Sequence, residues 1–399
     1  MQPKKYGYTR RGFIETAIGT FLLAGSGIGQ QPAGGKVKEM LVYIGTYTSG
    51  KSKSEGIYIY KLNLASGELY PYKIVKNVVD PSFLAIDKNN QYLYAVNETI
   101  EYEGRNSGAV SAFAIDQRSG DLSFLNKQPS LGGAPCYVSV SKDGKFVLAA
   151  NYVGGNVVVL PVEKDGRLAA STDLEQHSGS GPNKDRQEAA HAHSIVFADD
   201  NRFAFSGDLG TDKVMVYEYD RQSGKLKPNA AQPYYQTKAG AGPRHITFHP
   251  KGKIAFVINE LDMTISSFAY DGKRGTLRVI QTVPTLPPGF SGSNTCADIH
   301  VSPNGNFLFG SNRGHDSIVS YRISENGMLE YIEHTPTGGK TPRNLAIDPT
   351  GTFLLAANQN SDSIVVFRID EKTGKLAQTK TSVKVPSPVC LKLIPSFSA

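Results

Sequence analysis

Six charged or titratable side chains fall at two repeated positions of the sequence, and together they could carry out acid–base chemistry on an anionic substrate. They are His193, Arg244, Arg343, Glu98, Glu260 and Arg313. Arginine presents paired planar donors to a carboxylate or phosphate. Histidine is the natural general base near neutral pH. The chemistry therefore depends on whether the elements that carry these residues meet in space.

Similar segments recur along the chain at a nearly constant spacing. Seven short apolar runs end in a polar residue at the same place: Thr46, Asn97, Asn151, Asp208, Asn259, Asn312 and Asn358. Successive members lie about 46 to 57 residues apart. A Gly-x-Leu turn signal also recurs, as in SGEL (66–69), and another apolar run usually begins at proline, as in PRHITF (243–248). Each repeat therefore holds about four strands.

Repeats of about 50 residues with four strands each are typical of propeller blades. We therefore expect an all-β protein, a seven-bladed β-propeller with four-stranded antiparallel blades, in a single domain over residues 40–396. The first strand, near residue 41, is the second strand of its blade, and the last strand, 388–394, is the first of a blade. The C-terminal strand should thus pair with the N-terminal blade, which closes the ring and removes an open edge.

This blade order brings the repeated positions to one face. The first strand of each blade lines the centre and turns tightly into the second, so the start of one and the end of the other emerge together. Long connections lie on the same face, at 97–108, 177–192 and 285–295, and loops on a rigid scaffold commonly carry function. We expect the six residues to form one pocket there, with Tyr47 and Tyr152 beside them as substrate-binding residues.

Several members of this set also have a structural interpretation or a smaller expected role. Arg244 and Arg313 could form salt bridges between blades, with Glu260 or Glu98, instead of binding substrate. Glu260 could orient Arg244 or activate water. The register places Arg343 on a neighbouring sector, where a smaller role is expected.

Other polar residues suit architecture better than chemistry. Asp298, His300 and His245 fit polar contacts between strands. The Asn and Asp side chains at the strand ends recur seven times, and short polar side chains of this kind can satisfy turn amides. A feature that is repeated in every blade indicates structure.

Several segments resemble a known family. HAHSIVF, GPRHITFHPKG, VINEL, SNRGHDSI and GSGPNKDRQ look like the lactonase family of seven-bladed propellers, which includes bacterial 6-phosphogluconolactonases and the fungal carboxymuconate-lactonizing enzyme. The resemblance covers nearly the whole chain after residue 40. It implies a catalytic site of one histidine, two arginines and one glutamate, which correspond here to His193, Arg244, Arg313 and Glu260.

Two classes of function fit this pattern. A lactonase without metal or cofactor would hold a small lactone or sugar acid with its arginines, while His193 or Glu260 activates water. A lactonizing cycloisomerase, which forms a lactone instead of opening one, is an alternative enzyme. The alternative is a non-catalytic binding propeller outside the cytoplasm, since a fold alone does not fix function. The charged pocket favours the 6-phosphogluconolactonase-like enzyme. A third interpretation has a divalent cation held by Asp208, Asn97, Asn151 and Asn259.

The N-terminal segment carries a targeting pattern. Arg10 and Arg11 precede a short, weakly apolar, Gly-rich stretch, which resembles a twin-arginine export signal over residues 1–31. The apolar stretch is too short to span a bilayer convincingly. We expect export by the twin-arginine route to the periplasm or the extracellular space, with no stable membrane anchor afterwards.

The charge pattern argues against a nucleic-acid partner, and the cysteine spacing argues against a cysteine metal site. The formal net charge is +7, of which residues 4–15 supply +3, and no basic run with interleaved aromatic residues occurs. We therefore expect no nucleic-acid partner. Cys136, Cys296 and Cys390 lack the spacing of a metal site, and we expect them to be buried free thiols. We expect the protein to be a monomer.

Overall fold

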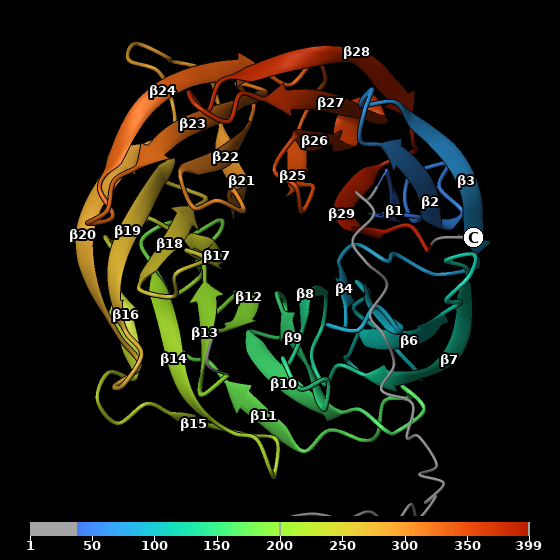
Figure 1. Ribbon diagram of the computed structural model, residues 1–399. Coiled ribbons are helices and arrows are strands. Elements are labelled where there is room, and N and C mark those ends of the chain that lie inside the picture. Colours follow the sequence, from blue (N-terminus) through green and yellow to red (C-terminus); the bar gives the residue numbers. More distant parts are fainter. Residues whose placement is uncertain (1–37, 199–200, 398–399) are drawn as a thin grey trace, which may run out of the picture. The chain divides into compact units, whose positions relative to one another are not determined.

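A computed structural model of the protein describes residues 38–198 and 201–397. Within these residues the chain forms 29 β-strands and one short 3-10 helix, η1 (Gln359–Ser361). The strands make seven antiparallel sheets, arranged radially around a central axis (Figure 1). Each sheet has four strands hydrogen-bonded in series from the inside to the outside, and one sheet has a fifth strand beside this series. This confirms the predicted seven-bladed propeller. The predicted export signal, residues 1–31, lies outside the described residues.

The blades are numbered here in chain order, with their strands given from the innermost outward. Blade 1 contains β29 (Pro388–Pro395), β1 (Glu39–Thr46), β2 (Gly56–Asn63) and β3 (Leu69–Lys76). Blade 2 contains β4 (Leu84–Ile86), β5 (Tyr92–Asn97), β6 (Ala109–Ile115) and β7 (Leu122–Pro129). Blade 3 contains β8 (Pro135–Val140), β9 (Phe146–Asn151), β10 (Asn156–Pro161) and β11 (Asp173–Gln176).

Blade 4 contains β12 (Ala192–Phe197), β13 (Phe203–Asp208), β14 (Lys213–Asp220) and β15 (Lys225–Pro228), and β16 (Tyr234–Gln236) also pairs with β14. Blade 5 contains β17 (Pro243–Phe248), β18 (Ile254–Asn259), β19 (Thr264–Asp271) and β20 (Thr276–Pro284). Blade 6 contains β21 (Thr295–Val301), β22 (Phe307–Arg313), β23 (Ser317–Ile323) and β24 (Leu329–Pro336). Blade 7 contains β25 (Pro342–Ile347), β26 (Phe353–Asn358), β27 (Ser363–Ile369) and β28 (Leu376–Lys384).

The C-terminal strand closes the ring as predicted. β29 pairs antiparallel with β1, with Leu41 opposite Ile394 and Ile44 opposite Leu391. Blade 1 is thus assembled from both ends of the propeller sequence. The edge that β1 would otherwise expose is hydrogen-bonded, which removes a site for unwanted strand pairing.

The hydrophobic core lies between the faces of neighbouring blades. All six residues of β9 and of β13 are buried, because each blade is covered on both faces by its neighbours. The outer strands are more exposed: along most of β28, partly buried residues alternate with exposed ones. One cluster joins Tyr43 of blade 1, Tyr94 of blade 2 and Val147 of blade 3. This packing holds β9 and β13 between neighbouring blades, and the innermost strands β8 and β12 are hydrogen-bonded to them.

Most of the inner strands share an irregularity close to their start. In six of the seven sheets the pairing of the inner strand with its neighbour shifts there, so that an extra residue is left outside the ladder as a β-bulge. The skipped residues include Cys136, His193, Arg244, Arg343 and Val389. A bulge bends the strand and re-aims its side chain. The sequence position predicted to carry chemistry is therefore also structurally distinct.

The polar residues that end the second strands fix the loops of the same face. Asn151 and Asn358 donate from their side-chain amides to the carbonyls of Ser130 and Thr337. Their role is architectural, as predicted, but these amides donate to loop carbonyls and do not accept from turn amides. Asp208 does accept backbone N–H groups, so the expected pattern holds in blade 4.

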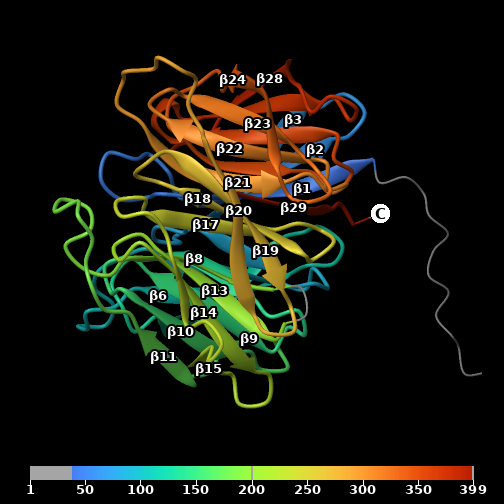
Figure 2. The ribbon, with the colours of Figure 1, turned by 90° about the vertical axis from the view of Figure 1, so that its left-hand side faces the viewer.

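The face on which the inner strands begin is called here the mouth face. The connection between β11 and β12, residues 177–191, projects well beyond the blades (Figure 2, green, at the left).

All three cysteines are buried and free, as predicted. Among the described residues, we find no helix with the length and hydrophobicity needed to cross a membrane.

Candidate active site

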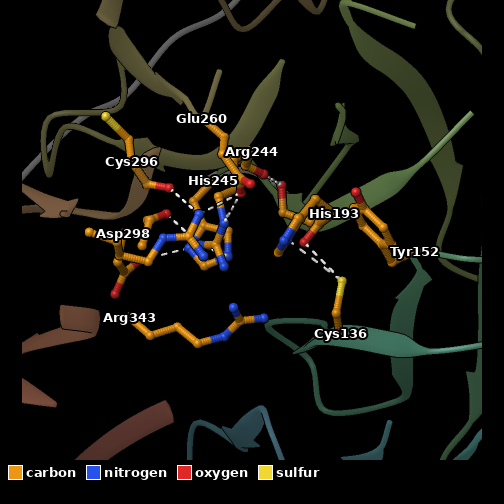
Figure 3. Close-up of polar contacts among 12 residues, drawn as sticks. Cys136, Tyr152, His193, Arg244, His245, Glu260, Cys296, Asp298 and Arg343 are labelled. Carbon is orange, nitrogen blue, oxygen red and sulfur yellow. Dashed lines mark hydrogen bonds and ion pairs between the residues drawn. The ribbon is translucent and has the colours of Figure 1, made fainter. Parts of the chain in front are cut away.

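A cavity of about 290 Å³ lies on the mouth face. Its walls are formed by Glu98, Cys136, Tyr152, Arg186, His193, Glu260, Arg313 and Arg343. Six of the eight predicted site residues line it, and the other two, Tyr47 and Arg244, lie directly behind its walls. Figure 3 shows Arg343 extending its guanidinium toward the space beside His193 and Cys136. Strands from different blades thus bring together residues that are far apart in the sequence.

Three arginines bind one carboxylate on one wall of the cavity. Arg244 Nε and Arg313 Nη2 lie 2.9 and 2.8 Å from Glu260 Oε2, and Arg186 Nη2 lies 2.6 Å from Oε1. Burial opposes the charged form of Glu260, but Arg313, Arg244 and Arg186 outweigh it and lower its pKa to about 2. Glu260 is therefore an anion at neutral pH, and it positions the arginines better than it could accept a proton.

Arg244 is the most deeply buried of the three arginines. Its side chain is only 2% exposed, and Nη1 donates to the Ala297 carbonyl and to His245 Nε2, the latter at 3.1 Å. Burial and the nearby Arg313 and Arg343 lower the pKa of Arg244 to about 10, so it stays a cation at neutral pH. Because it lies behind the wall, Arg244 acts on the cavity through Glu260.

A hydrogen-bonded network supports Arg244 from below. His245 Nδ1 lies 2.7 Å from Asp298 Oδ1, and His300 Nε2 lies 2.9 Å from Asp298 Oδ2. Burial and Arg244 lower the pKa of His245 to about 3, so the ring is neutral. Since arginine can only donate, His245 accepts at Nε2 and carries its proton at Nδ1. These contacts join blades 5 and 6, as predicted for polar contacts between strands.

His193 lies on a second wall of the cavity, between aromatic and sulfur neighbours. Its Nδ1 is 3.6 Å from Cys136 Sγ, and its ring meets those of Tyr152 and His245 edge-on at 5.5 and 5.4 Å between centroids. Burial and the charge of Arg244 keep the pKa of His193 well below its ordinary value. The imidazole is therefore neutral and can exchange hydrogen bonds with a bound molecule.

The wall formed by blades 1, 2 and 7 holds the second carboxyl group. Tyr47 Oη donates to Glu98 Oε2 at 2.9 Å, and the Ser82 hydroxyl donates to the same oxygen. Arg343 Nη2 donates to Tyr47 Oη at 2.9 Å. Burial raises the pKa of Glu98 even though Arg343 and the two hydroxyl donors oppose it. The pKa values of Glu98 and Glu260 are thus shifted in opposite directions within one cavity.

Arg186 is the charged wall residue that the sequence analysis missed. It comes from the 177–192 connection, which lies outside the repeat, so no register could place it. Buried Gln187 anchors this loop by donating to the Leu209 carbonyl and to Asp212 at 2.8 and 2.7 Å. A Cβ at Gly210 would lie 1.8 Å from the Ala189 carbonyl, so only glycine lets the loop pack this closely. The sequence feature that could have pointed to Arg186 is the segment GSGPNKDRQ, which contains this residue and resembles the lactonase family.

The alternative cation site does not assemble around Asp208. Its carboxylate lies 2.6 Å from His177 Nδ1 and accepts the backbone N–H groups of His191 and Thr211 at 2.9 and 3.0 Å. Across the described ranges, no group of three or more His, Cys, Asp and Glu side chains is placed to hold a metal ion.

Comparison with known proteins identifies the family. The model of a family described as "Lactonase, 7-bladed beta-propeller" matches residues 41–393. The chain belongs to this lactonase family. Membership confirms the predicted fold and the predicted enzyme class, a lactonase.

Curated and solved relatives match over most of their length. A 6-phosphogluconolactonase of Bacillus subtilis (strain 168) is 38% identical to this lactonase over 353 residues, which are 88% of this chain and 97% of the relative. A 6-phosphogluconolactonase of Formosa agariphila is 36% identical over 305 residues, 76% and 84% of the two chains. The structure of the periplasmic gluconolactonase of Pseudomonas aeruginosa has a TM-score of 0.83 at 35% identity, over 89% of this chain and 99% of that one.

Proposed function

We propose that this lactonase hydrolyses a small anionic lactone of the sugar-acid type, as a 6-phosphogluconolactonase-like enzyme that needs no metal or cofactor. The observation that carries the proposal is the charge of the cavity wall. Three arginines, Arg186, Arg313 and Arg343, line the cavity beside two carboxyl groups, Glu98 and Glu260. A fourth arginine, Arg244, lies behind the wall and is bound to Glu260. The excess positive charge suits an anionic substrate.

The arginines also suit the transition state of lactone hydrolysis. Attack of water on the lactone carbonyl creates an oxyanion, which fixed donors in a water-poor site stabilise strongly. Arg313 and Arg343 are held in place by Glu260 and Tyr47, so little reorganisation is needed when the charge develops. Neutral His193 is available to orient the attacking water by a hydrogen bond.

The proposal is tested by assaying the purified protein against 6-phosphoglucono-δ-lactone and glucono-δ-lactone, with the spontaneous hydrolysis rate subtracted. We expect turnover of at least one of them, with no loss after dialysis against a metal chelator. Binding of the hydroxy acid without turnover of either lactone would favour the non-catalytic propeller. Net ring closure of an unsaturated dicarboxylic acid would favour the cycloisomerase.

The proposal extends to the place where the enzyme works. The paired Arg10 and Arg11 support export by the twin-arginine route to the periplasm or the extracellular space. The similar Pseudomonas aeruginosa protein is itself named a periplasmic gluconolactonase. We infer a monomer that meets its lactone outside the cytoplasm without a membrane anchor or a nucleic-acid partner.

A further inference from the structure

We propose that Glu98 is the catalytic residue that takes a proton from water and returns it to the leaving oxygen of the lactone. This inference rests on the proposed lactonase function and names the proton carrier in its site. It starts from a contrast between two carboxyl groups of the same cavity. One is bound by three arginines, whereas the hydrogen bonds to the other come, among the described residues, from the hydroxyl groups of Tyr47 and Ser82.

The geometry leaves one oxygen of Glu98 available. Tyr47 and Ser82 both donate to Oε2, which fixes the orientation of the carboxyl group. In the part of the chain that the structure describes, no hydrogen bond is made to Oε1, although Glu98 lines the cavity. The backbone is fixed as well, because the Glu98 N–H donates to the Asp80 carbonyl at 3.0 Å. An oriented carboxylate with a free oxygen suits a general base.

The groups that act on Glu98 come from four blades. Arg343 belongs to β25, Tyr47 follows β1, Asp80 and Ser82 precede β4, and Cys136 belongs to β8. Burial raises the pKa of Glu98, and Asp80 adds to this effect, while Arg343, Ser82 and Tyr47 oppose it. Because the net direction is upward, the Glu98 carboxylate is a stronger base than an ordinary one.

The other candidates for proton transfer are poorly matched to the task. The pKa of Glu260 is lowered to about 2, which makes its carboxylate a very weak base. Protonation of His193 would place a new cation near Arg244, which its lowered pKa disfavours. When two titratable groups in one site are driven in opposite directions, the acid–base role falls to the group with the pKa nearer to neutral.

The reaction balances with this single proton carrier. The water oxygen bonds to the carbonyl carbon while one water proton passes to Glu98 Oε1, and the carbonyl electron pair becomes an oxyanion held by arginine. The carbonyl then re-forms, the bond from carbon to the ring oxygen breaks, and the ring oxygen takes the proton from Glu98. One water is consumed, one hydroxy acid forms, and Glu98 is again a carboxylate.

The test uses the full-length protein with Glu98→Gln, in which the amide keeps the shape but cannot accept the proton. We expect kcat/KM for the better lactone to fall by roughly 10²–10⁴. In the wild type, activity should fall as the pH drops through the raised pKa of Glu98, since the base must be ionised. The acidic limb of the pH profile should therefore be absent in Glu98→Gln.

Two further variants separate catalysis from structure. Glu101→Gln, on the same 97–108 connection and exposed, is the matched control and should behave as wild type. Glu98→Ala should regain activity with added formate, which a merely structural role would not allow. Wild-type kcat/KM and an intact acidic limb in Glu98→Gln, or no formate rescue of folded Glu98→Ala, would overturn the inference. Absence of turnover in the wild type would instead overturn the proposed function.

Discussion

Glu260 joins three arginines of different origin at the centre of the cavity wall. Arg244 comes from the inner strand of its own blade, Arg313 from blade 6, and Arg186 from a loop. The carboxylate therefore holds the cationic wall together. Its removal should affect stability first and substrate binding second.

We expect Glu260→Gln to lower the free energy of unfolding by about 3–5 kcal/mol, because the buried guanidinium of Arg244 loses its ion pair. The pKa of Glu260 in the folded protein, about 2, lies below its ordinary value. Its stabilising contribution is thus complete above the ordinary pKa and is lost as the pH falls toward 2. Denaturant unfolding over this pH range measures the effect. Exposed Glu371→Gln is the control, and an equally stable Glu260→Gln would contradict the ion-pair argument.

Arg313 and Arg343 should matter about equally for turnover, although the sequence register predicts a smaller role for Arg343. Both line the cavity, so Arg313→Ala and Arg343→Ala should each reduce kcat by roughly 10²–10³ through loss of an oxyanion donor. Steady-state kinetics on folded variants measures this. Exposed Arg278→Ala, on β20, should be unaffected, and wild-type kinetics in either cavity variant would remove that arginine from the site.

At the scale of the elements, the repeat predicts which residues gather but not how deeply each one lies. The register correctly places His193 and Arg343 at equivalent positions, because both follow the first residue of an inner strand. The bulges that free these positions leave no signal in the alternation of apolar and polar residues. The depth of Arg244 also depends on its neighbours, Ala297 and His245, which no local pattern reveals.

The strand that closes the ring supports a prediction at this scale. Deleting residues 388–399 should leave β1 with a bare edge and blade 1 without its inner strand, so the cooperative unfolding transition should be lost or shifted to a much lower temperature. Thermal unfolding and limited proteolysis would show this. Deleting only 398–399, which leaves β29 complete, is the control. An unchanged unfolding temperature after the larger deletion would show that ring closure does not stabilise the fold.

At the scale of the whole molecule, the sequence predicts the architecture well because a propeller repeats one pattern seven times. Each blade supplies independent signals of the same kind, so weak signals add up. Loops outside the repeat lack this support, which explains why Arg186 is missed while blade number and closure are predicted.

Export also belongs to the whole molecule. Replacing both Arg10 and Arg11 by Lys should leave the protein in the cytoplasm, because the twin-arginine route is a receptor-read address. Cell fractionation and immunoblotting measure the distribution, with Lys4 and Lys5 changed to Arg as the charge-matched control. Normal export of the double Lys variant would contradict the predicted route.

The bulged positions have a consequence for how this protein can change over evolutionary time. Because the skipped residue contributes no rung to the hydrogen-bonded ladder, its side chain can be exchanged while the pairing of its strand is kept. The side chains at the skipped positions of the inner strands can therefore differ from blade to blade. Blade 1 has Val389 at the position where blade 7 has Arg343. New specificities can arise by changing these side chains one at a time where they line the cavity, as His193 and Arg343 do. The buried Arg244 is the exception, because its ion pair with Glu260 also stabilises the fold.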